Sequence, residues 1–168
     1  MRTAFASVVA LFTVLALAPS AHALEPASNV RSAKWGVGLG GGNTVSGVSA
    51  KFNLGSGTAL QLVAGGAGYS NADFGSTALG VNLDFLLERP TITTFDGAFD
   101  LNWEAGVGGW TWIGDPFWFG VNGVLGLQFD LIPIPLDIVL EYRPAIRVIP
   151  DVGVQVVDFG AHVRFYFN

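Results

Sequence analysis

Residues 157–168, VDFGAHVRFYFN, alternate between apolar and mostly polar side chains. Successive side chains of a β-strand leave opposite faces of the sheet, so this alternation predicts a strand with one apolar and one polar face. Val163 and Phe165 share the apolar face, and Asp158 and Arg164 share the polar face. A soluble barrel turns its apolar face inward, whereas a membrane barrel turns that face toward lipid. The segment alone therefore fits two opposite architectures.

The same alternation recurs along the chain and gives eight predicted strands: 35–40, 49–54, 60–65, 79–85, 99–108, 119–131, 136–143 and 157–168. Compact turns are expected at 55–57, 87–91 and 132–135, and longer loops at 65–75, 109–116 and 144–153. Short turns that alternate with longer loops are typical of outer-membrane barrels, in which both termini lie at the periplasmic rim. The sequence therefore predicts an all-β fold, an eight-stranded antiparallel up-and-down transmembrane β-barrel.

The N-terminal residues have the features of an export signal. Arg2 provides a positive charge, residues 4–17 form an apolar run, and Ala21-His22-Ala23 is a small-x-small cleavage site. An uncleaved anchor helix is the alternative, but the apolar run is short for a membrane span. We therefore expect three parts, which are a signal peptide at 1–23, a periplasmic N-terminal segment at 24–33 and a barrel at 34–168 in the cell outer membrane.

The composition is that of a chain that exposes little charge to water. Only 12% of the residues are charged and 51% are hydrophobic, whereas about 25% charged residues are typical of soluble domains. The chain contains no cysteine, so neither a disulfide framework nor an acylated lipoprotein is expected. Its 13 acidic and 8 basic residues do not provide the basic surface that binds nucleic acids.

The positions of the phenylalanines favour lipid around the barrel. Five of them fall at the periplasmic ends of predicted strands, on the apolar face: Phe52, Phe85, Phe129, Phe165 and Phe167. Aromatic girdles at this level are typical of membrane barrels. A soluble lipocalin-like barrel would enclose these rings and leave the carboxylates in water. Alternation alone allows that arrangement, but export, low charge and the girdle favour the membrane barrel.

Across its mature length the chain resembles the small eight-stranded outer-membrane barrels, such as the OmpA membrane domain and OmpX. The segments PLDIVLEYRPAIRVIP and FGAHVRFYF are similar to the closing hairpin of an uncharacterised bacterial family of small outer-membrane barrels. The resemblance implies that the barrel assembly machinery recognises an aromatic C-terminus, although here Asn168 follows Phe167. We expect a monomer that is surrounded by outer-membrane lipids.

Charged side chains are expected on the inward face, where they would form a polar network in the lumen. Its members are Lys51, Asp84, Asp100, Glu104, Asp130, Asp137, Glu141, Arg143, Asp158, His162 and Arg164. An excess of carboxylates would suit a narrow cation-preferring channel, but an eight-stranded barrel is only wide enough for side chains to fill it. A packed ionic plug is therefore the preferred interpretation.

A charge at inward Asn122 is expected to be tolerated, and a charge at outward Leu127 is expected to destabilise the barrel.

No catalytic residue, cofactor or metal site is expected. His162 is the single histidine of the mature chain, so a histidine-based hydrolase would have to centre on it. Outer-membrane lipid deacylases of this size resemble the scaffold, but they place a serine beside the catalytic histidine on the lipid-facing surface, whereas His162 has inward parity. One histidine among carboxylates is also a weak metal site.

A glycine motif near the start of the barrel has the residue spacing of a dinucleotide-binding fingerprint but not its structural context. The motif is Gly36-x-Gly38-x-x-Gly41, and no βαβ pattern surrounds it. Glycine on the inward face of a strand would instead make room for large side chains from neighbouring strands. We therefore expect these glycines to have a packing role.

Aromatic residues gather in the segment 109–120, GWTWIGDPFWFG, around a predicted outer loop. Trp110, Trp112, Phe117 and Trp118 would form either the outer aromatic girdle or an exposed patch that docks a partner. Trp118 has inward parity and would then plug the barrel mouth.

The expected function is non-enzymatic: structural support of the membrane, or binding of an extracellular protein ligand through the loops. A lipid-modifying enzyme and a narrow channel are the competing classes.

The charges of the last two predicted strands indicate their register. Opposed residues of an antiparallel pair have a constant index sum, and a sum of 301 sets Arg143 opposite Asp158 and Asp137 opposite Arg164. The same register sets Glu141 diagonal to His162, within reach for long side chains. Because one register satisfies two opposite-charge pairs, we expect the two strands to adopt it.

Overall fold

The computed structural model describes residues 29–30, 32–67, 79–88 and 90–167, and every regular element in these ranges is a strand. The predicted signal peptide, the first half of the predicted periplasmic segment, most of the predicted loop 65–75, and Asn168 lie outside the described residues. The described part of the chain includes no helix that is long and apolar enough to cross a membrane.

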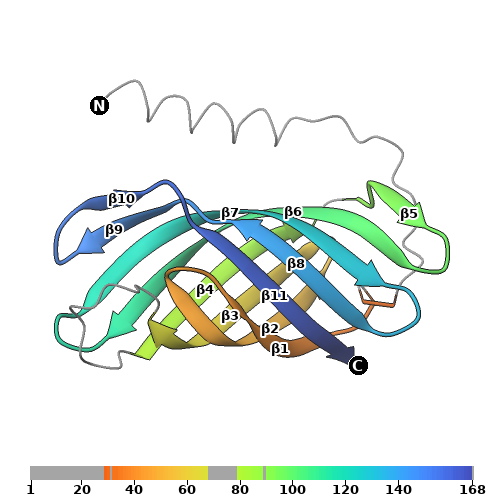
Figure 1. The fold of residues 1–168 in the computed structure, drawn as a ribbon, viewed down its shortest axis with the longest axis horizontal. Helices are drawn as coiled ribbons and strands as arrows, with labels where there is room; N and C mark the ends of the chain where they lie inside the picture. Colours follow the sequence, from red (N-terminus) through yellow and green to blue (C-terminus); the bar gives the residue numbers. More distant parts are fainter. Residues whose placement is uncertain (1–28, 31, 68–78, 89, 168) are drawn as a thin grey trace, which may run out of the picture.

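Eight long strands close into an antiparallel barrel (Figure 1). They are β1 (Trp35–Gly41), β2 (Val45–Gly55), β3 (Thr58–Ala67), β4 (Leu79–Glu88), β6 (Phe99–Ile113), β7 (Trp118–Leu131), β8 (Leu136–Tyr142) and β11 (Phe159–Phe167). Each long strand pairs with the next in the chain, and β1 closes the ring on β11, with Trp35 opposite Phe167. The predicted eight-stranded, up-and-down topology is confirmed.

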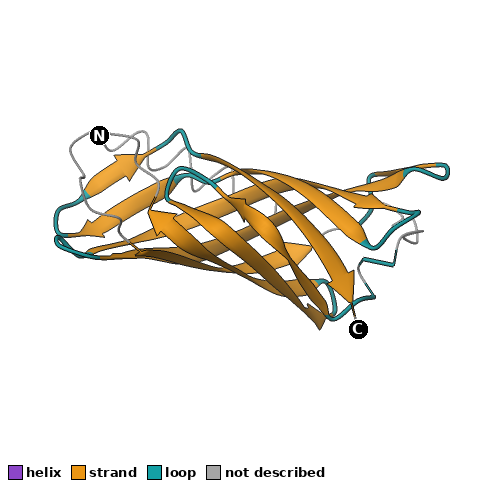
Figure 2. Ribbon diagram, turned by 60° about the horizontal axis from the view of Figure 1, so that its bottom comes forward, coloured by secondary structure: helices purple, strands orange, loops and turns teal. Residues whose placement is uncertain are grey.

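The barrel has two rims, which lie at opposite ends of its long axis in Figure 2. The terminal rim holds the start of β1, the end of β11, and the short β5 (Thr93–Phe95), which pairs with the start of β6. The hairpin rim lies at the other end and carries the hairpin of β9 (Ala145–Ile149) and β10 (Gly153–Gln155). Both ends of the barrel chain therefore meet at one rim.

Three connections differ from the sequence prediction. The compact turn expected at 87–91 is wrong, because the chain continues to residue 98 and forms β5 on the way. The loop expected at 109–116 is shorter, since β6 runs on to Ile113 and Trp112 pairs with Trp118 across the hairpin. The loop expected at 144–153 contains β9 and leads directly into β10.

The barrel wall forks where β8 ends. The backbone N–H of Arg143 donates to the carbonyl of Asp158 at 2.8 Å, and Pro144 has no N–H with which to continue a ladder. Beyond this point β9 takes the place of β8 beside β7, with Ala145 opposite Asn122. Strand β10 pairs with β9 instead of extending β11. On the side of β7, the sheet of β6, β7, β9 and β10 therefore extends the wall beyond the end of β8.

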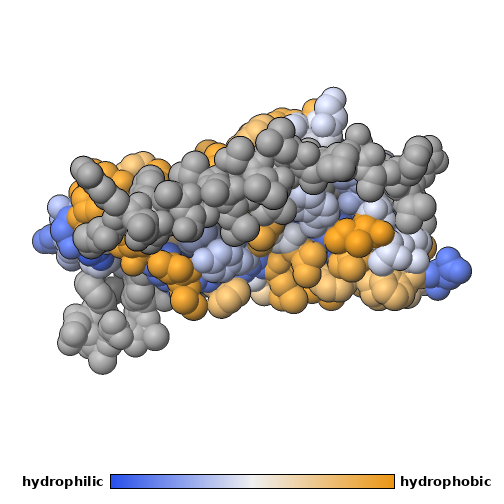
Figure 3. Space-filling model, turned by 90° about the horizontal axis from the view of Figure 1, so that it is seen from above, coloured by the Kyte–Doolittle hydropathy of each residue, from blue (hydrophilic) through white to orange (hydrophobic). Residues whose placement is uncertain are grey.

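The two faces of the wall have the polarity that the alternation predicts for a membrane barrel. Large apolar side chains point outward, and Leu39 is 69% exposed and Val107 62% exposed. Charged side chains point inward, and Asp84 and Arg164 are both 0% exposed. Figure 3 shows patches of apolar residues along the visible wall. Near the terminal rim the rings of Trp35 and Phe52 lie 4.4 Å apart on the outer face.

Glycines on the inward face of β1 make room for large side chains of β11, as the sequence predicts. A Cβ on Gly36 would lie 2.6 Å from the ring of Tyr166, and a Cβ on Gly40 would collide with the ring of His162. A Cβ on Gly38 would collide with the carbonyl oxygen of Val163, which is backbone and cannot swing away. The seam between β1 and β11 thus depends on the missing side chain at Gly38.

We predict that Gly38→Ala weakens this seam. Overpacking a tight site costs about 1–3 kcal/mol, and this loss should appear as a lower urea midpoint of the barrel in detergent or liposomes. Gly66→Ala is the matched control, because nothing lies within 4 Å of a Cβ at Gly66. Equal stability of the two variants would show that the seam is not tight.

Candidate functional site: the ionic interior and the indole cap

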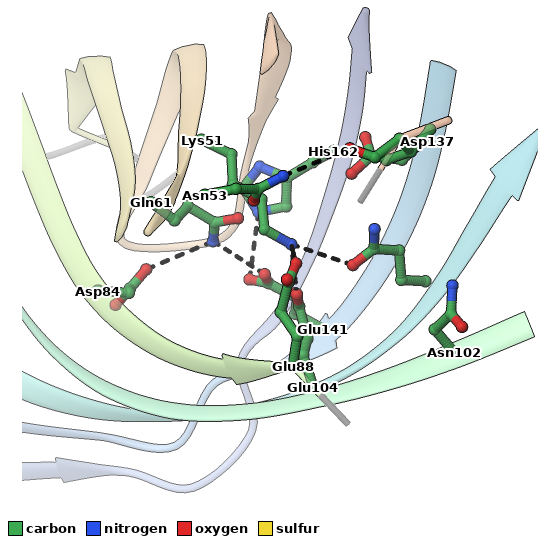
Figure 4. A network of polar contacts seen from close by, with 12 residues as sticks. Lys51, Asn53, Gln61, Asp84, Glu88, Asn102, Glu104, Asp137, Glu141 and His162 are labelled. Atoms are coloured by element: carbon green, nitrogen blue, oxygen red, sulfur yellow. Dashed lines mark hydrogen bonds and ion pairs between the residues drawn. The ribbon is translucent and has the colours of Figure 1, made fainter. Parts of the chain in front are cut away.

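Eleven charged or titratable residues lie buried inside the barrel, and together we call them the ionic interior. They are the residues expected from the sequence: Lys51, Asp84, Asp100, Glu104, Asp130, Asp137, Glu141, Arg143, Asp158, His162 and Arg164. Figure 4 shows how part of this set converges from strands on opposite sides of the barrel. Burial of so many charges requires that most of them find partners.

The pairing of β8 with β11 has the register that the charges predict. Asp137 lies opposite Arg164, and the Nη2 atom of Arg164 donates to Asp137 at 2.8 Å. The hydroxyl of Tyr166 donates to the same carboxylate at 2.8 Å. Arg164 also donates to the side-chain oxygen of Gln61, on β3 across the lumen. This cluster joins β3, β8 and β11 near the terminal rim.

The second predicted ion pair is not formed by the side chains. Arg143 and Asp158 lie opposite each other, and their backbones are hydrogen-bonded. The guanidinium of Arg143 instead reaches Asp84 at 2.7 Å and also pairs with Glu141. Two carboxylates attract the guanidinium of Arg143 more strongly than the single carboxylate of Asp158. Sequence spacing gave the register correctly but not the direction of this side chain.

Asp158 lies just before β11 and receives a different partner. Its Oδ1 atom accepts the backbone N–H of Asn43 at 2.9 Å, which ties the β1–β2 turn to the fork. Burial raises the pKa of the Asp158 carboxyl above its ordinary value, and the Asn43 hydrogen bond opposes this rise. The residue therefore links two connections at the hairpin rim.

Lys51 supplies the positive charge on the opposite side of the lumen. Its Nζ atom lies 2.6 Å from Glu88, 2.8 Å from Glu104 and 3.0 Å from the side-chain oxygen of Gln128. These partners come from β4, β6 and β7, whereas Lys51 comes from β2. A single ammonium thus gathers three strands that do not neighbour its own.

The remaining carboxylates are held by neutral donors. The hydroxyl of Thr94 donates to Asp100 at 2.7 Å. The amides of Asn102 and Gln128 donate to Asp130 at 2.7 and 2.6 Å. No group of three or more histidine, cysteine or acidic residues in the described ranges is arranged to hold a metal ion.

Ser49, His162 and Glu141 form a hydrogen-bonded chain, in which the predicted contact of Glu141 with His162 is confirmed and the contact of Ser49 was not predicted. The Ser49 Oγ atom lies 2.9 Å from His162 Nδ1, and His162 Nε2 lies 3.1 Å from Glu141 Oε2. This is the order of nucleophile, base and acid in a hydrolytic triad. All three side chains are buried, and Ser49 is 0% exposed. A substrate carbonyl would need to reach Ser49 for nucleophilic catalysis. Within the barrel the three side chains link β2, β8 and β11.

Three tryptophans close the interior at the hairpin rim, and together we call them the indole cap. Trp110 and Trp112 are buried, so they form neither the outer girdle nor the exposed patch considered from the sequence, whereas Trp118 packs against them as its inward parity indicates. Trp110 and Trp112 lie in β6 with only 2% and 4% of their surface exposed, because both have inward parity. Trp118, in β7, stacks on Trp112 with ring centroids 4.8 Å apart. Of the four predicted patch residues, Phe117 alone lies in the loop with its ring exposed.

The cap is fixed from both sides. The indole N–H of Trp112 donates to the carbonyl of Thr44 at 2.7 Å. Val45 and Val63 pack with Trp110 and Trp112 in one buried cluster. Apolar packing at this level separates the ionic interior from the hairpin rim.

Sequence reasoning named the charged residues of the interior and missed neutral residues that connect them. The missed residues include Ser49, Gln61, Asn102, Gln128 and Tyr166. Inward parity marks each of them as a lumen residue. Parity does not predict which side chains meet across the lumen. For example, the Nε2 atom of Gln61 on β3 donates to Oε1 of Glu141 on β8 at 2.9 Å.

Comparison of the chain with protein-family models, with curated proteins and with solved structures found no match.

We predict that the Asp137 and Arg164 charges are coupled. Asp137→Arg or Arg164→Asp alone should lower the unfolding free energy by about 3–5 kcal/mol, because each leaves like charges together in a buried site. The double exchange should recover much of this loss. Urea midpoints in liposomes measure all three variants, and additive losses would show that the pair is not coupled.

Asp151→Ala provides the matched control for a charge that faces water. Asp151 pairs with Arg147 at 2.7 Å, but its side chain is 67% exposed. Removal of an exposed partner should change the unfolding free energy by only about 0–1 kcal/mol. A loss as large as that of the buried variants would indicate general damage to the hairpin.

Proposed function

We propose that the chain is an integral outer-membrane barrel of the small eight-stranded kind, similar to the OmpA membrane domain and OmpX. Its role is structural support of the membrane or binding at the cell surface, without enzymatic activity. The observation that carries the proposal is the polarity of the wall, with apolar side chains outside and the ionic interior inside. In water this arrangement would expose apolar surface on every strand and bury charges. Both would raise the free energy of the folded state.

The two rims support an orientation in that membrane. Outer-membrane barrels have short turns and both chain ends at the periplasmic rim. The terminal rim holds both ends of the barrel chain and the short β2–β3 and β7–β8 turns, although the β4–β6 connection at this rim is longer and forms β5. The hairpin rim would then face the cell exterior. The predicted signal peptide would direct export, and the C-terminal strand with Phe167 would be presented to the barrel assembly machinery.

The packed interior supports a plug rather than a channel. Buried ion pairs join opposite walls, as between Arg143 and Asp84, and the indole cap closes the hairpin rim. The Ser49–His162–Glu141 chain is enclosed in the same way, which disfavours a lipid-modifying enzyme. Binding at the cell surface would then take place at the hairpin rim, where the sheet of β6, β7, β9 and β10 extends beyond the barrel.

We predict a depth-dependent cost of charge on the outer face. Leu127→Arg should impair folding by about 2–4 kcal/mol if its position is near the bilayer midplane, and Ile113→Arg by about 0–1 kcal/mol near the hairpin rim. Both side chains are exposed, at 45% and 53%. Folding into liposomes, read from heat-modifiable gel mobility and urea midpoints, measures the difference. Equal tolerance at both positions would favour a barrel surrounded by water.

The expectation that Asn122→Asp is mild needs revision. The side-chain amide of Asn122 donates to Asp84 Oδ1 at 2.8 Å. Aspartate at this position would replace that hydrogen bond with two adjacent buried carboxylates. An inward position tolerates charge only where a partner of opposite charge is within reach.

A further inference from the structure

A small cavity lies at the hairpin rim, beside the indole cap. It has a volume of about 130 Å³, and its lining includes Trp110, Trp118, Arg147, Gly153 and Gln155. These residues come from β6, β7 and the β9–β10 hairpin. None of the ion pairs of the ionic interior involves them, so the cavity is a separate feature of the fold.

The cavity is built on one cross-strand row of the extended sheet. Trp110 lies opposite Gly120, Gly120 opposite Arg147, and Arg147 opposite Gly153. A Cβ on Gly120 would lie 2.6 Å from the Trp110 ring, and a Cβ on Gly153 would lie 3.1 Å from the guanidinium of Arg147. The two glycines thus provide the space that the indole and the guanidinium occupy.

The polar groups that line the cavity include N–H donors without acceptors. The indole Nε1 atom of Trp110 is buried and has no hydrogen-bond partner in the described part of the chain. Arg147 donates from Nε to the carbonyl of Asp151 at 3.1 Å and from Nη2 to its carboxylate at 2.7 Å. A guanidinium has five N–H groups, so further donors of Arg147 are available toward the cavity.

Arg147 is held in place before any ligand arrives. Its guanidinium carbon lies 4.3 Å from the centre of the Trp118 ring, and Asp151 fixes it from the other side of the hairpin. A planar guanidinium held in this way is suited to bind a planar or tetrahedral oxyanion through paired hydrogen bonds. Because Asp151 already offsets the charge, binding should be moderate in strength and sensitive to salt.

The size of the cavity limits what can enter. At about 30 Å³ of liquid volume for each water molecule, the cavity corresponds to about four waters. Drug-sized ligands need about 300 Å³ or more. A single small group fits, and the rest of a larger molecule would extend beyond the cavity.

We propose that this cavity binds an oxyanion group, a carboxylate or phosphate, with Arg147 and the Trp110 indole N–H as its donors. The inference rests on the proposed function only for the source of the group, since the hairpin rim would face either a soluble extracellular molecule or a lipid headgroup. Binding itself does not depend on the membrane. Failure of binding and failure of outer-membrane location are therefore separate results.

The test uses folded, purified barrel in detergent micelles, titrated with inorganic phosphate at constant ionic strength against chloride. Tryptophan fluorescence and calorimetry report binding, because an anion beside Arg147 changes the electrostatic surroundings of Trp110 and Trp118. We expect saturable binding that weakens roughly tenfold or more in Arg147→Gln, which loses charge-assisted hydrogen bonds. Trp110→Phe, which keeps a ring but loses the N–H, should also weaken it. Heat-modifiable mobility verifies that each variant is folded.

Lys34→Gln is the matched control, because it removes the same charge from an exposed position at the terminal rim. Its affinity should equal that of the wild type. No saturable binding of either inorganic phosphate or phosphatidic acid by the wild type, or equal weakening in Lys34→Gln and Arg147→Gln, would overturn the proposal and leave a water-filled cavity. A second titration, with phosphatidic acid mixed into the micelles, distinguishes the sources. Binding of inorganic phosphate supports a soluble ligand, and binding of phosphatidic acid alone supports a headgroup.

Discussion

The pairing of charges inside a barrel that is too narrow for bulk water constrains the rest of the structure. An interior of eight strands is filled by side chains, so each inward charge must meet a partner at contact distance or destabilise the fold. Arg164 with Asp137, Arg143 with Asp84, and Lys51 with Glu104 meet this requirement. The contacts of Arg143 and Lys51 cross the lumen between strands that are not neighbours, and they brace opposite walls of the barrel.

The inner and outer faces are coupled by the geometry of the strands. A slip of one residue in any strand would exchange its faces, turning charges toward the surroundings and apolar side chains inward. The ion pairs therefore define the register of the wall, and the register in turn creates the apolar outer surface. Inward glycines complete this arrangement, because Tyr166 and His162 occupy space that side chains at Gly36 and Gly40 would need. A chain with few charges can thus specify a barrel if nearly all of them lie on one face.

Local periodicity predicted the strands and the parity of their side chains, since both depend on residues close in sequence. The 301 register of the last pair followed from the opposite charges on the two strands, although the β9–β10 hairpin lies between them. Periodicity did not predict β5, or that β6 continues through Trp110 and Trp112, because a tryptophan-rich segment fits both a loop and a strand with inward rings. Local periodicity also did not predict the direction of the Arg143 side chain. That direction depends on Asp84 of β4, which only the closed barrel brings within contact distance of Arg143.

The fork at Arg143 has a mechanical consequence. Above it the β9–β10 hairpin is joined by backbone hydrogen bonds to β7 and not to β11, so the hairpin is attached to the barrel along one edge only. A pulling force on the hairpin would be carried as shear through the β7 ladder, while the seam between β1 and β11 would bear none of it directly. We expect such a load to separate the hairpin from β7 and to leave the barrel closed. The rim can therefore deform without opening the barrel wall.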